Sequence, residues 1–461
     1  MISRRALLQS SVAASAAVLA RARRAAAQAP QPTQPTQPTP PATAPGAGGP
    51  AGHGAHKTAA PVGPRRLTQG RAVPGEPYAP VVVPNGWTLP FEKKGGVKVF
   101  HLTAQPVKHE IAPGLEIEAW GYSGTTPGPL IECALGDRVR IYVTNKLPEP
   151  TSVHWHGVLL PNGMDGVAGL TQPVIRAGET FKYEFTMTRA GTFMYHPHFD
   201  EMTQIALGMV GMIVVHRRDA QRAARRVRDY SLMAHEWKIP IGAARPDPMA
   251  MNDFNTLTFN SKAFPATEPL VAEQGDLVRI RLGNLGPMDH HPLHLHGHVF
   301  EVTETDGGPV PRSARRPETT TLVPVGAVRV IEFVADALGD WPFHCHMTHH
   351  VMNQMGHDAP NLVGASTQGI DARMTRVVPG YMTMGATGMG EMHRMQLPDN
   401  SISMLGGDGP FGLIDMGGMF TILKVRKQLS GDLDPGWYEH PAGTVAAKAT
   451  AEELARDGIK P

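Results

Sequence analysis

One short stretch of the chain reads His344-Cys345-His346-Met347-Thr348-His349-His350-Val351-Met352-Asn353-Gln354-Met355. Within it, a thiol, an imidazole and a thioether follow one another at intervals of five residues, as Cys345, His350 and Met355. A thiolate, two imidazoles and a weak axial thioether form the blue-copper ligand set. With His291 as the second imidazole, the sequence predicts a type 1 copper site.

Four His-X-His pairs surround and include this stretch. Residues i and i+2 of a strand point to the same face, so each pair directs two imidazoles to one place. The pairs also repeat, and with them a Gly-Asp dipeptide. Three sequence features thus recur in the same order and at nearly the same spacing, which predicts two homologous domains. The repeats are His154-Trp155-His156 with His294-Leu295-His296 (140 residues apart), His196-Pro197-His198 with His344-Cys345-His346 (148), and Gly136-Asp137 with Gly275-Asp276 (139).

Short strand-like runs dominate from about residue 97 onward. They alternate or cluster Val, Ile, Phe and Tyr between Pro, Gly and Asn, and no long helical periodicity occurs. This pattern predicts an all-β chain built from β-sandwich domains. A further run over residues 418–426 is expected to add a last strand to the second domain. The predicted strands are Val97 to Leu102, Leu115 to Tyr122, Arg138 to Val143, Phe181 to Thr186 and Met209 to Val215.

The four histidine segments, in this order across residues 125–355, resemble the signature segments of multicopper oxidases. The resemblance implies two cupredoxin-like Greek-key β-sandwich domains and four copper ions per active unit. It assigns type 1 copper to His291, Cys345, His350 and Met355. It assigns type 2 copper to His154 and His294, and the binuclear type 3 pair to His156, His196, His198, His296, His344 and His346.

The resemblance also implies a reaction. A reducing substrate, either a phenolic or aromatic compound or a metal ion such as Cu(I) or Mn(II), gives up electrons singly at type 1 copper. They pass through Cys345 to its neighbours His344 and His346, and the trinuclear cluster reduces O2 to water with four of them. Asp165, in Gly163-Met164-Asp165-Gly166, resembles the family's proton-relaying carboxylate. An Asp-Gly turn is the alternative interpretation, and the second acid of some relatives is absent.

The spacing of the pairs bears on the assembly. Only about 90 residues separate His198 from His291, too few for an inserted third domain, and the only Cys of a His-X-His pair lies in the second domain. The chain thus resembles the two-domain, small-laccase branch of the family. That likeness implies a homotrimer whose clusters join the first domain of one subunit to the second domain of the next, a closed head-to-tail ring. A monomer with an intrachain cluster is the alternative.

Three other functions are weighed against this one. Zinc is disfavoured because it needs about four ligands in one tetrahedron. A copper nitrite reductase would carry type 1 copper in its first domain and would not need four pairs. A copper-sequestering, copper-tolerance protein is favoured by the methionine-rich tail, since thioethers suit Cu(I); the same tail is compatible with a cuprous oxidase. Its methionines are Met374, Met382, Met384, Met389, Met392 and Met395.

The N-terminus predicts export. Residues 1–29 contain Arg4-Arg5 before an Ala-rich apolar run too short to span a membrane, and resemble a twin-arginine signal peptide. The leader holds five arginines and no acids, so removing it takes the net charge from +2 to −3. This charge predicts neither a nucleic-acid nor a membrane partner. The expected location is the periplasm or the exterior.

The remaining organisation follows from composition. Residues 30–74, rich in Pro, Gln, Thr, Ala and Gly, are predicted to be a disordered tether. Residues 75–220 and 221–365 are the two domains, joined by a basic linker around residues 217–229. Residues 366–461 hold the methionine-rich loop, the last strand and a tail. Cys133 is expected to be a buried apolar residue. No role is assigned to His216, His235, His290, His298, His349 or His357.

Overall fold

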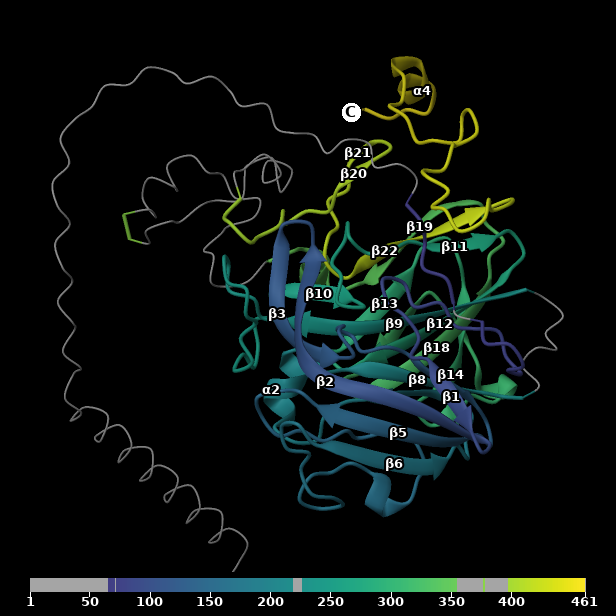
Figure 1. Ribbon diagram of the computed structural model, residues 1–461. Helices are drawn as coiled ribbons and strands as arrows, with labels where there is room; N and C mark the ends of the chain where they lie inside the picture. Colours follow the sequence, from purple (N-terminus) through teal and green to yellow (C-terminus); the bar gives the residue numbers. More distant parts are fainter. Residues whose placement is uncertain (1–64, 71, 219–225, 355–375, 378–396, 461) are drawn as a thin grey trace, which may run out of the picture. The chain divides into compact units, whose positions relative to one another are not determined.

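The computed structural model describes residues 65–70, 72–218, 226–354, 376–377 and 397–460 (Figure 1). Strands make up most of the regular structure in this part of the chain. The two α-helices within it, α2 (Glu201–Ala206) and α4 (Ala451–Arg456), are short. None of the described helices is long and apolar enough to cross a membrane.

Two sheets form the first domain. One has the order β1-β2-β5-β6 with β3 beside β2, and the other has the order β4-β8-β7. Alternate residues of β5 are buried, so its sheet directs one face into the core. Every residue of β4, β7 and β8 is buried, so the other sheet is covered on both faces. The strands are β1 Phe91–Lys94, β2 Val97–Ala112, β3 Leu115–Tyr122, β4 Ile131–Ala134, β5 Arg138–Asn145, β6 Thr180–Thr186, β7 Gly191–Tyr195 and β8 Gly211–His216.

The second domain repeats this plan on a larger scale. One sheet has the order β10-β9-β12-β18-β14-β15 with β16 beside β14, and the other has the order β11-β22-β19-β13-β17. The strands are β9 Val227–Trp237, β10 Thr256–Phe259, β11 Leu270–Glu273, β12 Leu277–Asn284, β13 His291–Leu295, β14 Phe300–Thr305, β15 Gly308–Pro309, β16 Pro317–Glu318, β17 Thr320–Val323, β18 Ala327–Val334, β19 Gly339–Cys345 and β22 Phe420–Arg426. A separate hairpin joins β20 (Asp408–Gly409) to β21 (Gly412–Leu413).

The strands predicted from the sequence are confirmed. Each lies within or overlaps β2, β3, β5, β6 or β8. The run over 418–426 contains β22 (Phe420–Arg426), which pairs with β11 on one side and β19 on the other. β22 is therefore an interior strand of the sheet that carries Cys345, and the second domain draws on the chain as far as Arg426.

One boundary prediction was wrong in detail. Residues 65–70 do not belong to a disordered tether: Leu67 is buried, and its N–H donates to the Asp432 carbonyl. Composition could not reveal this contact because its partner lies far along the chain. The domain boundary predicted around residues 217–229 overlaps the interval between β8, which ends at His216, and β9, which begins at Val227.

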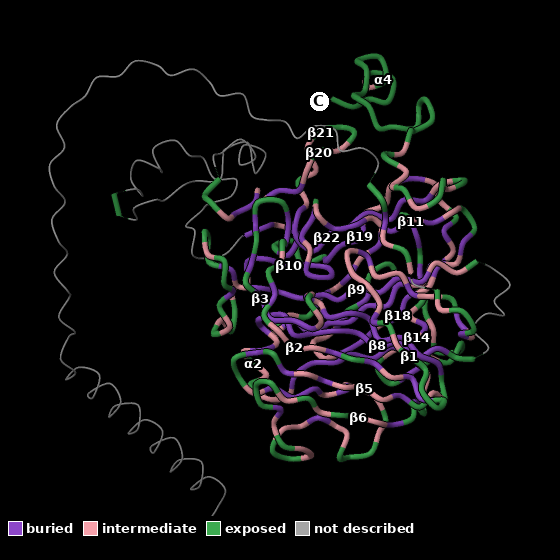
Figure 2. Tube along the Cα trace, in the orientation of Figure 1, coloured by how far each residue is buried: buried purple, intermediate pink, exposed green. Residues whose placement is uncertain are grey.

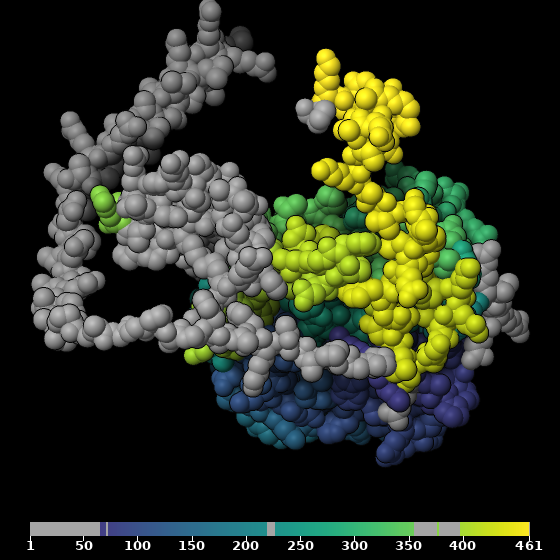
Figure 3. Space-filling model, turned by 90° about the horizontal axis from the view of Figure 1, so that it is seen from above, coloured from purple at the N-terminus to yellow at the C-terminus, as the bar shows by residue number. Residues whose placement is uncertain are grey.

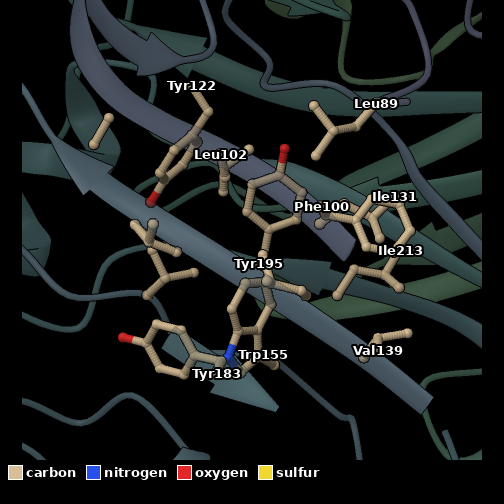
Figure 4. Packing of buried hydrophobic residues seen from close by; sticks show 14 of the residues in the cluster. Leu89, Phe100, Leu102, Tyr122, Ile131, Val139, Trp155, Tyr183, Tyr195 and Ile213 are labelled. Carbon is tan, nitrogen blue, oxygen red and sulfur yellow. The ribbon is translucent and has the colours of Figure 1, made fainter. Parts of the chain in front are cut away.

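Each sandwich has its own apolar core, visible as the buried strands of Figure 2. In the first domain the core centres on aromatic rings (Figure 4). Trp155 packs edge-on against Tyr183, with 5.2 Å between ring centroids. Because Trp155 lies between His154 and His156, burial of its ring holds both histidines at the edge of this core. Cys133 is buried in β4 as predicted, and burial raises the pKa of its thiol.

The two domains share further apolar contacts. Met194, Met212 and Val214 of the first domain pack with residues of the second, among them Met233 and Val330. The long β2–β3 hairpin also reaches the second domain, where Ile111, Leu115 and Ile117 pack against Trp237 and Ile239. Such burial is worth about 1.5–3 kcal/mol for a fully buried large side chain, so the pair of domains forms one packed unit. The C-terminal segment, yellow in Figure 3, is mostly exposed.

Candidate copper centres

Three side chains of the second domain converge at the end of adjacent strands. His291 begins β13, Cys345 ends β19, and His350 lies in the short 3-10 helix η4 (Thr348–Val351). Cys345 Sγ lies 3.4 Å from His350 Nδ1 and 3.8 Å from His291 Nδ1, and the two nitrogens are 3.3 Å apart. All three residues are buried. Met355, the predicted axial ligand, lies outside the described residues.

The donor atoms of this cluster fit a bound cation. Burial lowers the pKa of His350 to about 4, which leaves its imidazole neutral and able to donate a lone pair. Burial also raises the pKa of Cys345 to about 12. A thiol with a raised pKa is protonated at neutral pH, and it becomes a thiolate when a bound metal ion displaces the proton. One soft sulfur with two imidazole nitrogens suits copper.

Two carboxylates lie behind the imidazoles of this cluster. Glu236 Oε2 is 3.4 Å from His291 Nε2, and both side chains are 0% exposed. Asp289 Oδ2 is 3.6 Å from His350 Nε2 and is partly exposed. The sequence analysis missed both. For Glu236 a signal existed, because an acid within the otherwise largely apolar run Leu232–Trp237 is expected to be buried and therefore to need a partner.

The first domain gathers its four predicted ligands into a half-site. His154 and His196 form a β-bridge, and the ring centroids of these histidines lie 5.3–6.2 Å apart in five pairs. His156 Nδ1 faces His196 Nε2 at 3.2 Å. Ligand atoms of His154, His156 and His196 lie within 4.8 Å of one another. Burial lowers the pKa of His196 to about 3, so this imidazole is neutral at neutral pH.

Backbone and carboxylate groups fix which nitrogen of each imidazole is free. His154 Nδ1 lies 2.7 Å from the Asp165 carbonyl and 3.5 Å from its Oδ1, which leaves Nε2 for a metal. Gly166 permits this approach, because a Cβ there would lie 1.8 Å from the Val153 carbonyl oxygen. Asp165 thus orients His154; its predicted proton relay stays a prediction. Glu201 Oε1, unforeseen in the sequence, lies 3.4 Å from His196 Nδ1.

The second domain forms a matching half-site. His296 Nε2 faces His344 Nε2 at 3.1 Å, and His294 and His346 have ring centroids 5.3 Å apart. His294 Nδ1 is held by the Thr319 carbonyl at 2.7 Å, and His344 Nδ1 by the Cys345 carbonyl at 2.8 Å. In each half-site, two imidazoles thus have one ring nitrogen beside a backbone carbonyl, which leaves the other free: His154 and His196 in the first, His294 and His344 in the second. This is the orientation that metal-bound histidines have.

The two half-sites do not meet within the described chain. No ring contact and no group of convergent ligand atoms there joins a histidine of one half to a histidine of the other. His198 is partly exposed and His346 is exposed. Each half thus presents imidazoles to the surface of the chain rather than to its own counterpart.

Among the described residues of the first domain there is no second thiolate cluster, for a structural reason. The repeat offset places Thr151 where the second domain has His291. Thr151 is buried, and its hydroxyl donates to the Gln204 Oε1 atom at 2.7 Å. Gln204 is itself fully buried and donates to the Pro150 carbonyl. A satisfied hydroxyl–amide pair occupies this position, so the thiolate–imidazole cluster belongs to the second domain.

Three of the histidines without an assigned role pack against other side chains, outside both metal-ligand groups. His216 Nε2 lies 2.7 Å from Glu132 Oε1, and the ring stacks on Tyr78. His235 is buried against Trp237, and His298 packs on Phe333 and Trp341. His357, like the methionines from Met374 to Met395, lies outside the described residues.

Two β-sandwiches carrying one thiolate–imidazole cluster and two histidine half-sites define a copper protein with cupredoxin-like domains. Two family models, both described as "Multicopper oxidase", match residues 103–220 and 240–362, more than half of the chain. The chain belongs to the multicopper oxidase family, whose members bind copper at type 1, type 2 and type 3 sites. The family predicted from the sequence is confirmed.

Several relatives share part of the chain. It is 29% identical over 276 residues to a "Probable nitrite reductase-hydroxylamine oxidoreductase fusion protein" of Kuenenia stuttgartiensis, covering 57% of this chain and 31% of the relative. It is 30% identical over 241 residues to "Multicopper oxidase MmcO" of Mycobacterium tuberculosis, covering 45% and 47%. The chain thus spans less than half the length of either relative. The solved structure "Multicopper Oxidase mgLAC" matches with a TM-score of 0.53 and 27% identity, covering 72% of this chain and 88% of that one.

The neutral imidazoles predict a pH dependence for the copper-free protein. The pKa of His196 in the folded chain is about 3, against 6.5 ordinarily. Below pH 6.5 the unfolded chain binds a proton that the folded chain does not, so the free energy of unfolding falls as pH falls from 6.5 toward 3. The slope from this group is at most about 1.4 kcal/mol per pH unit. Chemical denaturation from pH 7 to 4 measures it, and His196→Gln should flatten the profile. An equally steep profile in that variant would contradict the assignment.

Proposed function

We propose that this copper oxidoreductase is a laccase-like oxidase that couples one-electron oxidation of a small reducing substrate to four-electron reduction of O2 to water. The observation that carries the proposal is the joint presence of one buried thiolate–imidazole cluster and two histidine half-sites. Bound copper would supply the redox chemistry. A single redox centre would release partly reduced oxygen, whereas several centres together can deliver four electrons.

The chain's own residues supply the path between these sites. Cys345 is bonded through the backbone to His344 and His346, so the thiolate cluster and the second half-site share one short segment of β19 and its end. Burial of His291, Cys345 and His350 excludes water from the thiolate. On the other half-site, the Asp165 backbone and carboxylate hold His154 in one orientation, and Glu201 lies beside His196 and His198. We assign proton delivery to Asp165.

The proposal includes a homotrimer in which each trinuclear site joins the first domain of one subunit to the second domain of the next. Separation of the half-sites within the described chain supports it. Exposed apolar side chains also flank both halves in sequence, and contact with another subunit would bury them. Near the first half these are Leu159, Leu170 and Met202; near the second they are Val299, Leu322 and Met347.

Two substrate classes fit the type 1 cluster, phenolic or aromatic compounds and metal ions. Asp289, partly exposed and 3.6 Å from His350 Nε2, gives a route from solvent to the cluster. Exposed Met288 adjoins it and offers a soft thioether suited to Cu(I). Together with the methionine-rich segment, which lies outside the described residues, Met288 favours Cu(I) among the metal ions.

Oxygen uptake separates the candidate functions. With a phenol, Cu(I) and Mn(II) tested side by side, the copper-loaded protein is expected to consume one O2 for every four electrons. A copper-sequestering protein would bind Cu(I) and consume none. Nitrite reductase activity is disfavoured because the thiolate cluster belongs to the second domain. Nitrite reduction without oxygen uptake would contradict the proposal.

Export by the twin-arginine pathway to the periplasm or the exterior is part of the proposal. It rests on Arg4-Arg5 and the apolar run that follows. Replacing both arginines with lysine should retain the protein in the cytoplasm, as fractionation would measure.

A further inference from the structure

Glu236 contacts the type 1 cluster from the side opposite Cys345. His291 directs Nδ1 toward Cys345 Sγ and His350 Nδ1, and its other ring nitrogen, Nε2, faces Glu236 Oε2 at 3.4 Å. Neither Glu236 nor His291 has any exposed side-chain surface. Burying a carboxylate costs free energy unless the group is paired or hydrogen-bonded. Glu236 therefore needs partners inside the protein.

The loop between β12 and β13 is built around this carboxylate. The backbone N–H groups of Met288 and Asp289 donate to Glu236 Oε1 at 2.6 and 2.8 Å. Gly286 leaves the necessary space, since a Cβ at this position would lie 1.6 Å from Glu236 Oε2. Asn284 holds the loop in place by donating to the Asp289 carbonyl and accepting from the Gly286 N–H. Two donors and a glycine therefore fix the carboxylate with one oxygen toward His291.

The loop between β12 and β13 has a counterpart in the first domain, whereas the carboxylate of Glu236 has none. Asn145 occupies the position of Asn284 and makes the same contacts, to the Glu149 carbonyl and from the Leu147 N–H. The strand registers align Ala104 with Asn145 and Ala234 with Asn284. Two residues further on, the first domain has Pro106 where the second has Glu236. The loop scaffold is thus common to both domains, and the acid accompanies only the thiolate cluster.

We propose that Glu236 is a positioning residue that presents His291 Nδ1 to type 1 copper and lowers the reduction potential of that site. A carboxylate that accepts the Nε2 proton leaves the Nδ1 lone pair free and makes the imidazole a stronger donor. A stronger donor beside a buried negative charge stabilises the more highly charged Cu(II) over Cu(I). This inference rests on the proposed type 1 site and adds what sets its potential.

The isosteric variant Glu236→Gln tests the role. Its amide oxygen can still accept from Met288 and Asp289, which turns the NH2 group toward His291, where it cannot accept the Nε2 proton. We expect the equilibrium constant for reduction to rise about tenfold, equivalent to about 59 mV for a one-electron couple. We also expect copper affinity to fall by about 10–100-fold. Redox titration of the blue absorption and copper competition measure the two effects.

Glu132→Gln is the matched control. Glu132 is also a buried carboxylate that faces a buried histidine, His216, at 2.7 Å and accepts a backbone N–H, from Val81 at 2.9 Å. It lies in the first domain, so its loss should lower stability without moving the potential. If Glu236→Gln lowers stability equally and leaves the potential at the wild-type value, Glu236 is a structural residue only and the inference is overturned.

A second variant tests the same inference in case Glu236→Gln does not fold. Gly286→Ala places a methyl group where Glu236 Oε2 lies and must displace the carboxylate, so the potential should move in the same upward direction. An unchanged potential in this variant, with the blue absorption retained, would also overturn the inference. Absence of blue absorption in the wild-type copper-loaded protein would instead overturn the proposed type 1 site, and the inference with it.

Discussion

Replacing Cys345 with serine is expected to remove the intense blue absorption and the proposed oxidase activity together. The absorption arises from the bond between copper and a thiolate, and Cys345 is the only cysteine in either metal-ligand group among the described residues. Serine keeps the shape but cannot supply a soft thiolate. Because a ligand is lost rather than an outer partner, turnover should fall by more than the about 10–100-fold typical of outer-shell changes.

The other cysteine provides a control. Cys133 is buried in β4 of the first domain and has no histidine partner among the contacts of the described residues. Cys133→Ser should cost about 1–3 kcal/mol because a hydroxyl is buried with little hydrogen bonding, while the blue absorption stays. Absorption spectra and metal analysis of both variants measure the difference. A blue Cys345→Ser protein would refute the ligand assignment, as would loss of the colour in Cys133→Ser alone.

Most members of the metal-ligand groups could be predicted because they lie close together in the sequence; His291, 54 residues before Cys345, is the exception. The two histidines of each His-X-His pair are neighbours in the sequence and lie at a strand end or an isolated β-bridge, and His350 follows Cys345 by one short 3-10 helix. The strand over Leu115–Tyr122 was likewise readable from alternation and matches β3 residue for residue. Patterns of this kind contain both partners within a few residues, so no knowledge of the tertiary fold is required.

Contacts between distant segments could not be predicted in the same way. Glu236 meets His291 across 55 residues, and only the folded loop between β12 and β13 reveals that Met288 and Asp289 complete the carboxylate's hydrogen bonds. Leu67 is buried because residues near Asp432 pair with it. Asn145 and Asn284 have equivalent roles in the two domains, but these roles depend on contacts with backbone groups that only the folded chain reveals.

Separation of the half-sites predicts that two inactive variants restore each other. One carries His154→Ala and His156→Ala, which removes the first half-site; the other carries His294→Ala and His296→Ala, which removes the second. Each alone should have no complete trinuclear cluster. We expect every cluster to join the first domain of one subunit to the second domain of the next. An intact cluster then forms where the first domain comes from a His294→Ala/His296→Ala subunit and the second domain comes from a His154→Ala/His156→Ala subunit.

For subunits mixed in equal amounts and reassembled at random, the two required choices each have a probability of one half. About a quarter of the wild-type clusters should therefore return in a closed head-to-tail ring. Oxygen uptake and copper content of the mixture, measured after unfolding and refolding together, test this. Mixing without refolding is the control, since assembled rings should not exchange. An intrachain cluster cannot be rescued by any mixture, so zero recovery, with wild-type subunits refolding normally, would refute the shared site and favour the monomer.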